Sequence, residues 1–202
     1  MVLSAKRLCE RIRIGNRPDL IGISIVPEPD LHAIERAGEV SITLRLGRWF
    51  TTLKQSHEKS LELDPKESQP ESKISKSYFV PFGKDYILHP GRFVLGCTLE
   101  WVRLPSDAAA FVVGKSKLGR RGIIIETASG VHPGFCGCIT LEIANVGEIP
   151  VNLIAGMPIC QLFFHDISGE VGLAKTSLSG QRKPRVGQLQ NDPILERLRK
   201  TR

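Results

Sequence analysis

The 202-residue sequence has few aromatic residues, only two methionines and no long apolar run. Its longest uninterrupted apolar stretch is Ala108–Val113, far shorter than the roughly 18 residues that a membrane-spanning helix needs. No apolar segment follows the charged start of the chain, so a signal peptide is not predicted either. These absences predict a soluble, cytoplasmic protein without a membrane partner.

The cysteine pattern also lacks the signs of a disulfide framework or a zinc site. The five cysteines are an odd number in a chain without an export signal, so reduced thiols are expected. Neither the H-x-E nor the P-C-x-x-C element of zinc nucleobase deaminases occurs. Cys136 and Cys138 would face the same way on a strand, and with His132 and His165 they leave a metal site open as a lesser alternative.

Charge of one sign is in excess. The chain has 28 Lys and Arg against 21 Asp and Glu, a net charge of +7, which favours anionic partners. Part of this excess lies in the tail from Gln181 to Arg202, where no aromatic residue stands between the cations. A stacking surface for single strands interleaves rings with cations, so no nucleic-acid partner is predicted.

Turn residues divide most of the chain into short segments. Residues Ser4–Arg13 are expected to form a helix with Ser4 as its N-cap. From Tyr78 to Ile167, short apolar segments alternate with Gly and Pro turns, which predicts an all-β sandwich or barrel. We expect one β domain over residues 1–175, with an exposed insertion at 55–77, and a flexible C-terminal arm over 176–202.

Four ordered motifs carry a resemblance to a known family. The segments Tyr86–Pro105, Gly114–Gly122 (GKSKLGRRG), Thr127–Glu142 (TASGVHPGFCGCITLE) and Pro150–Phe164 resemble the dCTP deaminase family of the trimeric dUTPase-like superfamily. The resemblance implies a distorted β-barrel or jelly-roll, a homotrimer with active sites shared at subunit interfaces, and a C-terminal arm that closes over the nucleotide.

The family's activity implies an enzyme that hydrolyses dCTP to dUTP and ammonia, a hydrolase acting on a cyclic amidine C–N bond. By this resemblance the reaction uses no zinc, and Mg²⁺ accompanies the triphosphate without a protein-only cage. Pyrimidine deoxynucleotides would be the only partners besides further copies of the chain.

The resemblance places three catalytic residues. Glu142 would shuttle a proton from water to the ring and the leaving amine, while Ser116 and Arg120 would position the water and stabilise charge. On a strand, Thr140 and Glu142 face the same way and Leu141 faces the core, which puts the carboxylate at the mouth of the barrel.

The same resemblance assigns contacts to the substrate. The basic loop after Gly114 would bind phosphate, and other contacts would come from the third motif, the last strand and the arm. The predicted substrate-binding residues are Lys115, Lys117, His132, Thr140, Gln161, Lys183 and Gln188, with Arg185 as an alternative to Lys183.

Three departures from the family pattern leave alternatives open. Lys115 replaces an Arg, Lys117 replaces a Ser, and His132 stands where the family carries Asp. A nearby polyphosphate favours the protonated imidazole, which cannot act as a base, so we expect no appreciable dUTP hydrolysis. The alternatives are a diverged nucleotide-binding paralogue with a regulatory role and a dUTP pyrophosphohydrolase.

Overall fold

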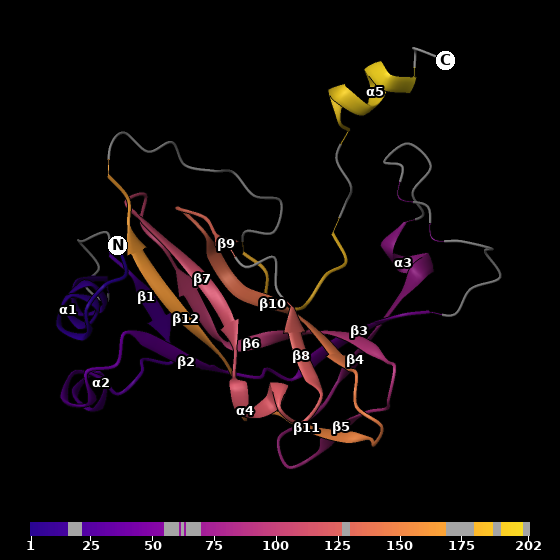
Figure 1. Ribbon diagram of the computed structural model, residues 1–202, viewed down its shortest axis with the longest axis horizontal. Helices are drawn as coiled ribbons and strands as arrows, with labels where there is room; N and C mark the ends of the chain where they lie inside the picture. Colours follow the sequence, from indigo (N-terminus) through magenta and orange to yellow (C-terminus); the bar gives the residue numbers. More distant parts are fainter. Residues whose placement is uncertain are drawn as a thin grey trace.

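Three antiparallel β-sheets form the body of the protein (Figure 1). The computed structural model describes residues 1–15, 22–54, 61, 63, 70–126, 130–168, 180–187 and 191–199. The predicted mainly β class with a short N-terminal helix is confirmed. The strands do not close into a barrel, because the edge strands of the two larger sheets form no common ladder in the described part of the chain.

The largest sheet has the strand order β4-β3-β6-β10-β8, and β1 also pairs with β6. Its strands are β1 (Ser24–Val26), β3 (Trp49–Leu53), β4 (Ser75–Phe79), β6 (Phe93–Arg103), β8 (Ile123–Glu126) and β10 (Cys136–Asn145). The long pair β6 and β10 runs through its centre. This pair is therefore the platform on which nearby side chains are placed.

A second sheet has the order β2-β12-β7-β9, and a small one pairs β11 with β5. These strands are β2 (Ser41–Arg45), β5 (Asp85–Leu88), β7 (Ala108–Gly114), β9 (Gly130–Val131), β11 (Val151–Ile154) and β12 (Pro158–Asp166). The apolar residues between the larger sheets form one core cluster that includes Phe50, Leu141 and Phe164.

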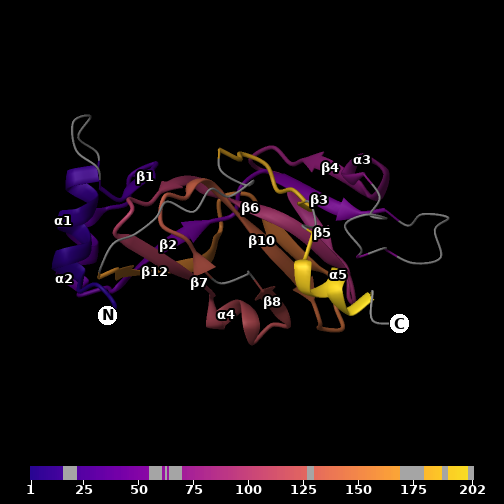
Figure 2. The same ribbon diagram turned by 90° about the horizontal axis from the view of Figure 1, so that it is seen from above.

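Five helices complete the described chain: α1 (Ala5–Gly15), α2 (Leu31–Ala37), α3 (Glu71–Ile74), α4 (Ser116–Gly119) and α5 (Pro193–Arg199). Figure 2 shows α1 and α2 together at one end of the molecule and α3 with β4 toward the other. No described helix has the length and apolar character that crossing a membrane requires.

Strand β10 alternates strictly between buried and half-buried residues. Leu141 and Ile143 are fully buried, whereas Thr140 and Glu142 are half-buried and point away from the core. The period of two that the sequence predicts for this segment is thus confirmed.

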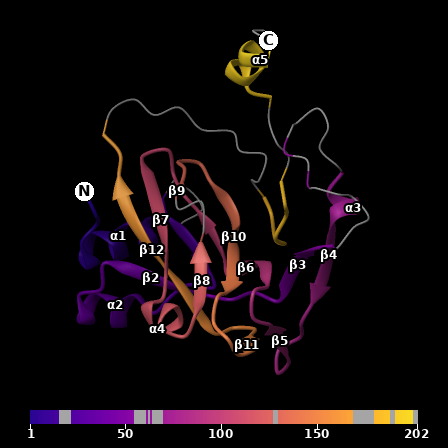
Figure 3. The same cartoon turned by 45° about the vertical axis from the view of Figure 1, so that its right-hand side comes forward.

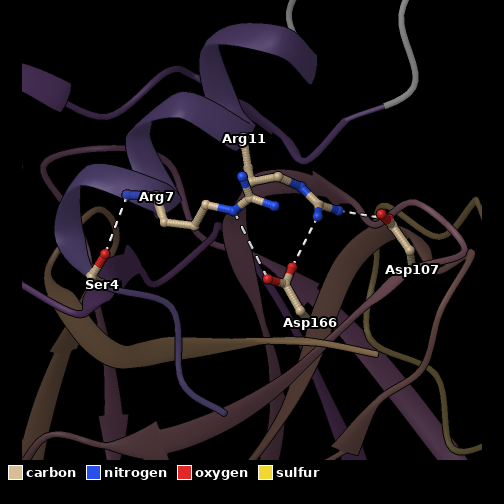
Figure 4. Close-up of polar contacts among 5 residues, drawn as sticks. All are labelled: Ser4, Arg7, Arg11, Asp107 and Asp166. Carbon is tan, nitrogen blue, oxygen red and sulfur yellow. Dashed lines mark hydrogen bonds and ion pairs between the residues drawn. The ribbon is translucent and has the colours of Figure 1, made fainter. Parts of the chain in front are cut away.

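Helix α1 is held by both apolar and ionic contacts. Leu8 and Ile12 are fully buried on one face, as their i, i+4 spacing predicts. On another face the Arg11 guanidinium donates to Asp107 at 2.6 Å and to Asp166 at 2.9 Å (Figure 4). Ser4 Oγ accepts the Arg7 backbone N–H at 3.4 Å, as an N-cap does. The helix is therefore fastened to the end of β12 and to the turn before β7.

Parts of the predicted insertion and of the predicted arm are among the described residues. The end of the 55–77 segment forms α3 and the start of β4, which pairs with β3, while residues 55–60, 62 and 64–69 lie outside the described residues. In the arm, residues 180–187 run along the main sheet, and 176–179 lie outside the described part. Thr51 Oγ1 donates to the Pro184 carbonyl at 3.1 Å, so local composition alone missed a long-range contact.

Candidate functional site

A cavity of about 730 Å³ opens over the centre of the main sheet. Strands β6, β8, β9 and β10 form its walls, and the arm closes one side. Figure 3 shows the arm reaching down between β10 and β3. The lining is largely apolar and includes Leu95, Ile124, Phe135, Ala144 and Val186. A cavity of this volume and lining suits a small organic ligand.

Three predicted site residues meet in this cavity. Thr140 and Glu142 project from the outward face of β10, and His132 follows the short strand β9. Glu142 is half-buried and stands opposite Leu95 of β6 in the strand register. The cavity thus sets a carboxylate among apolar groups, with a hydroxyl and an imidazole beside it. A carboxylate in this setting can take a proton from water and pass it to the ring of a bound ligand.

The arm adds two residues to the cavity that carry polar groups. Gln181 is buried, and its backbone carbonyl accepts a hydrogen bond from the Cys138 backbone N–H at 2.8 Å. Glycine at position 137 permits this close approach of the two backbones. A Cβ there would lie only 3.2 Å from the backbone nitrogen and oxygen of Gln181. Arg185, the predicted alternative to Lys183, also lines the cavity. Sequence reasoning missed Gln181, although the glycine at 137 was a usable sign of close backbone approach.

An acidic anchor fixes the end of this stretch of the arm. Glu71 of α3 accepts the Val186 backbone N–H at 3.0 Å and forms an ion pair with Arg185, with 3.5 Å between Oε2 and Nε. The exposed Arg185 side chain is therefore held by a residue that lies far from it in the sequence.

The basic loop lies elsewhere. Ser116 begins α4, which follows β7 at the lower end of β8 in Figure 1, and Ser116, Lys117 and Arg120 are exposed. None of the three is among the residues that line the cavity. Arg121 donates to the Lys117 carbonyl at 2.7 Å, which holds the loop in a tight turn. One copy of the chain therefore does not bring Ser116 and Arg120 to Glu142.

The remaining predicted contacts fall in other places. The Lys115 ammonium donates to Thr43 Oγ1 at 2.7 Å, and Gln161 is the register partner of Thr43 on β12, so these residues share the surface of the second sheet. Lys183 places its ammonium 3.8 Å from the centre of the Trp49 ring. Gln188 lies outside the described residues.

The lesser metal alternative finds no support in the geometry. Within the described ranges, no three His, Cys, Asp or Glu side chains are grouped closely enough to hold a metal ion. His165 instead packs edge-on against Phe111, with 5.1 Å between the ring centres. Burial raises the pKa of the Cys138 thiol.

Comparison with known proteins gives consistent matches. The family model described as dCTP deaminase-like matches residues 18–167, which confirms the resemblance that the motifs predict. A protein of Dictyoglomus thermophilum named "dCTP deaminase, dUMP-forming" is 45% identical over 129 residues, which are 63% of this chain and 65% of that protein. The chain thus spans just under two thirds of that relative.

Other relatives align over more of their length. A dUMP-forming dCTP deaminase of Methanobrevibacter smithii is 36% identical over 83% of this chain and 81% of its own. A dCTP deaminase of Halorubrum lacusprofundi is 34% identical over 96% of this chain and 93% of its own. The solved dCTP deaminase of Agrobacterium tumefaciens has a TM-score of 0.48 at 22% identity, over 63% of this chain and 38% of that one.

The names of these relatives bear on the expected product. Two of them are called dUMP-forming, whereas the motifs led us to expect dUTP as the end product. The expectation of no dUTP hydrolysis rests on a bound phosphate that keeps the His132 imidazole from acting as a base. His132 is exposed and also lines the cavity, so it is in contact with water.

Proposed function

Because this chain belongs to the dCTP deaminase-like family, we propose that it hydrolyses the amino group of dCTP and releases the nucleotide as dUMP. The observation that carries the proposal is the placement of Glu142 in an apolar cavity beside Thr140 and His132. Two waters are consumed in all, and the products are dUMP, ammonia and pyrophosphate.

The deamination step follows from the chemistry of one carboxylate. Glu142 takes a proton from a water molecule while the water oxygen bonds to C4 of the cytosine ring. The carboxyl group then passes that proton to the ring nitrogen N3. The second proton of that water then moves from the new C4 hydroxyl through Glu142 to the amine. The bond from C4 to the exocyclic nitrogen breaks as ammonia leaves, and a uracil carbonyl remains. Leu95, Ile124 and Ala144 line the same cavity and exclude bulk water from this transfer.

Ser116 and Arg120 would reach this cavity from another copy of the chain. Both are exposed and stand outside the cavity of their own chain, which supports a site shared between subunits. The apolar rim of the cavity also supports a site shared between subunits. Its residues Leu53, Phe93 and Val146 line the cavity and remain 43–62% exposed in the single chain. A neighbouring copy in a homotrimer would cover these apolar groups and supply a hydroxyl and a guanidinium.

Magnesium enters the proposal only with the nucleotide. The proposed chemistry needs no protein-bound zinc, and Mg²⁺ would neutralise the triphosphate oxygens. Removing tightly bound metal and restoring Mg²⁺ should therefore return full activity. A stoichiometric zinc ion whose loss abolishes ammonia release would contradict this part.

The test of the function is one incubation of the full chain with dCTP and Mg²⁺, with ammonia, dUTP, dUMP and pyrophosphate measured separately. Ammonia and dUMP in equal amounts are expected. Tight binding of dCTP without ammonia would indicate instead a regulatory nucleotide-binding protein. Pyrophosphate from dUTP without ammonia from dCTP would indicate a pyrophosphohydrolase.

His132 is the residue that we assign to the second hydrolysis. A neutral imidazole accepts a proton from the water that attacks the α-phosphate, and the P–O bond to the β-phosphate breaks. His132→Ala should keep ammonia release and cause dUTP to accumulate in place of dUMP. The exposed His89, which does not line the cavity, provides the control His89→Ala. Unchanged dUMP formation by His132→Ala would refute the assignment.

A further inference from the structure

A second cavity, of about 470 Å³, lies beside the first. Cys138 lines both cavities, but Thr140, Glu142 and His132 line only the first. The walls of the second come from the segment Gly47–Trp49, the segment Cys97–Leu99 with Trp101, and Arg182 of the arm. Any ligand here would thus contact residues that the proposed reaction does not use.

Two aromatic rings and two cations are among the residues that line this second cavity. Both tryptophans of the chain, Trp49 and Trp101, line it and are half-buried. The Arg182 guanidinium lies 5.2 Å from the centre of the Trp101 ring. Arg48 lines the same cavity and stacks on Phe82 at 4.8 Å. Each indole therefore has a cation over one of its faces, Arg182 over Trp101 and the Lys183 ammonium over Trp49 at 3.8 Å.

The charge of these arginines is not neutralised by the part of the chain that the structure describes. The described ion pairs join Arg7, Arg11, Arg13 and Arg185 to carboxylates, and neither Arg48 nor Arg182 takes part in one. Among the described residues, no Asp or Glu lines the cavity. An anion entering it would meet two guanidinium forks and no opposing carboxylate.

We propose that this second cavity binds a nucleotide, with the base against the tryptophans and the phosphates on Arg48 and Arg182. Indole rings stack on any heterocyclic base, and guanidinium groups bind phosphate with paired N–H donors. The volume lies within the range of cavities that hold one small ligand. The proposal does not depend on the deaminase function, because the two cavities have different polar residues.

The arm connects the two cavities. The arm passes next to Cys138, whose backbone N–H donates a hydrogen bond to the Gln181 carbonyl. The Cys97 thiol donates to the backbone carbonyl of Arg182 at 3.8 Å. Arg182 then faces the second cavity and Arg185 the first. A nucleotide held by Arg182 would therefore fasten the arm over both.

The tryptophans provide a built-in reporter for the test, since both line the second cavity and neither lines the first. The full chain carrying Glu142→Gln, which prevents turnover, is titrated with ATP and Mg²⁺ while tryptophan fluorescence is followed. A saturable change with one site per chain is expected. ATP should bind at least about tenfold more tightly than adenosine or inorganic triphosphate, since each lacks one half of the recognised groups.

A matched pair of arm variants locates the signal. Arg182→Gln should raise the ATP midpoint about tenfold or more, and Arg185→Gln should leave it within about twofold. Both side chains are exposed, so neither change threatens the fold. The proposal is overturned if both variants act alike, if inorganic triphosphate binds as well as ATP, or if no fluorescence change occurs. Tighter binding of a thymidine decamer than of ATP would assign the cavity to a nucleic-acid strand and overturn it as well.

Discussion

At the scale of single residues, the proposed deamination depends on Glu142 as the proton carrier. The amide of Glu142→Gln has the shape of the carboxyl group but cannot accept and return a proton. Ammonia release from dCTP should therefore fall by about 10²–10⁴, the range for a lost general acid–base group, while nucleotide binding remains. Steady-state kinetics and a binding titration measure the two effects.

Glu148 supplies the control for this prediction. It is exposed in the turn after β10 and does not line the cavity, so Glu148→Gln removes the same charge from the same region. Its turnover should match that of the parent chain. Near-normal ammonia release by Glu142→Gln, or an equal loss in both variants, would show that Glu142 is not the proton carrier.

A second carboxyl group, Glu100, makes stability depend on pH. It is 6% exposed, and burial raises its pKa above the ordinary value of 4.5 despite the hydrogen bond from the Arg45 backbone N–H at 2.8 Å. A raised folded-state pKa stabilises the fold below the ordinary value, and this contribution is lost as pH rises through the folded-state pKa. Glu100→Gln keeps an acceptor for Arg45 and abolishes this titration.

The free energy of unfolding of both proteins, measured by denaturant titration at several pH values, tests this. The difference between them should shift in favour of Glu100→Gln as pH rises from about 4 toward 7. A difference that is constant with pH, or that shifts in favour of the parent chain, would contradict the assignment.

Residue-level prediction from the sequence succeeded where a local rule applies. The alternation of β10 alone placed Thr140 and Glu142 on the outward face and Leu141 in the core, as the structure has them. It could not show that His132 shares their cavity, because that depends on how β9 pairs with β7 across the chain. The resemblance, not the spacing, supplied that residue.

At the scale of elements, the arm and α3 act together. Glu71 accepts a hydrogen bond from the Val186 N–H and pairs with Arg185, which lines the first cavity. Glu71→Ala should release this part of the arm and raise the KM for dCTP about threefold to tenfold, the effect of losing about 1 kcal/mol, with little change in kcat.

Lys73→Ala, in the same short helix with an exposed side chain, is the control for the loss of a charged residue there. Its KM should equal that of the parent chain. If Glu71→Ala leaves KM unchanged, or if it lowers the melting temperature as strongly as it raises KM, the arm does not act on the substrate through this anchor.

The same elements show where composition misleads. The polar stretch 55–77 has the residue content of a loop, yet its end forms α3 and pairs β4 with β3. The arm is polar and basic, yet Pro184 is buried and its carbonyl accepts a hydrogen bond from Thr51. Local content predicts conformational freedom, but pairing with segments elsewhere in the chain decides the outcome.

At the scale of the whole molecule, the sheets bring only part of the predicted site together. The first cavity contains Glu142, Thr140 and His132, whereas Ser116 and Arg120 lie on the exposed α4. The rhythm of short apolar segments predicted the mainly β class, but it contains no information on barrel closure or on contacts between copies. A complete site, in our account, forms only when copies of the chain assemble.

The most direct test of this central claim is complementation between two inactive variants. Glu142→Gln lacks the proton carrier and Ser116→Ala lacks the group that positions the water, so each alone should release almost no ammonia from dCTP. The two are unfolded, mixed in equal amounts and refolded together, with each variant refolded alone as the control. If each site combines Glu142 of one copy with Ser116 of the next around a ring, about one quarter of the sites in the mixture are intact, and ammonia release should recover to about a quarter of the parent rate. A mixture as inactive as either variant alone would contradict the account, because it would mean that Glu142 and Ser116 must belong to the same chain.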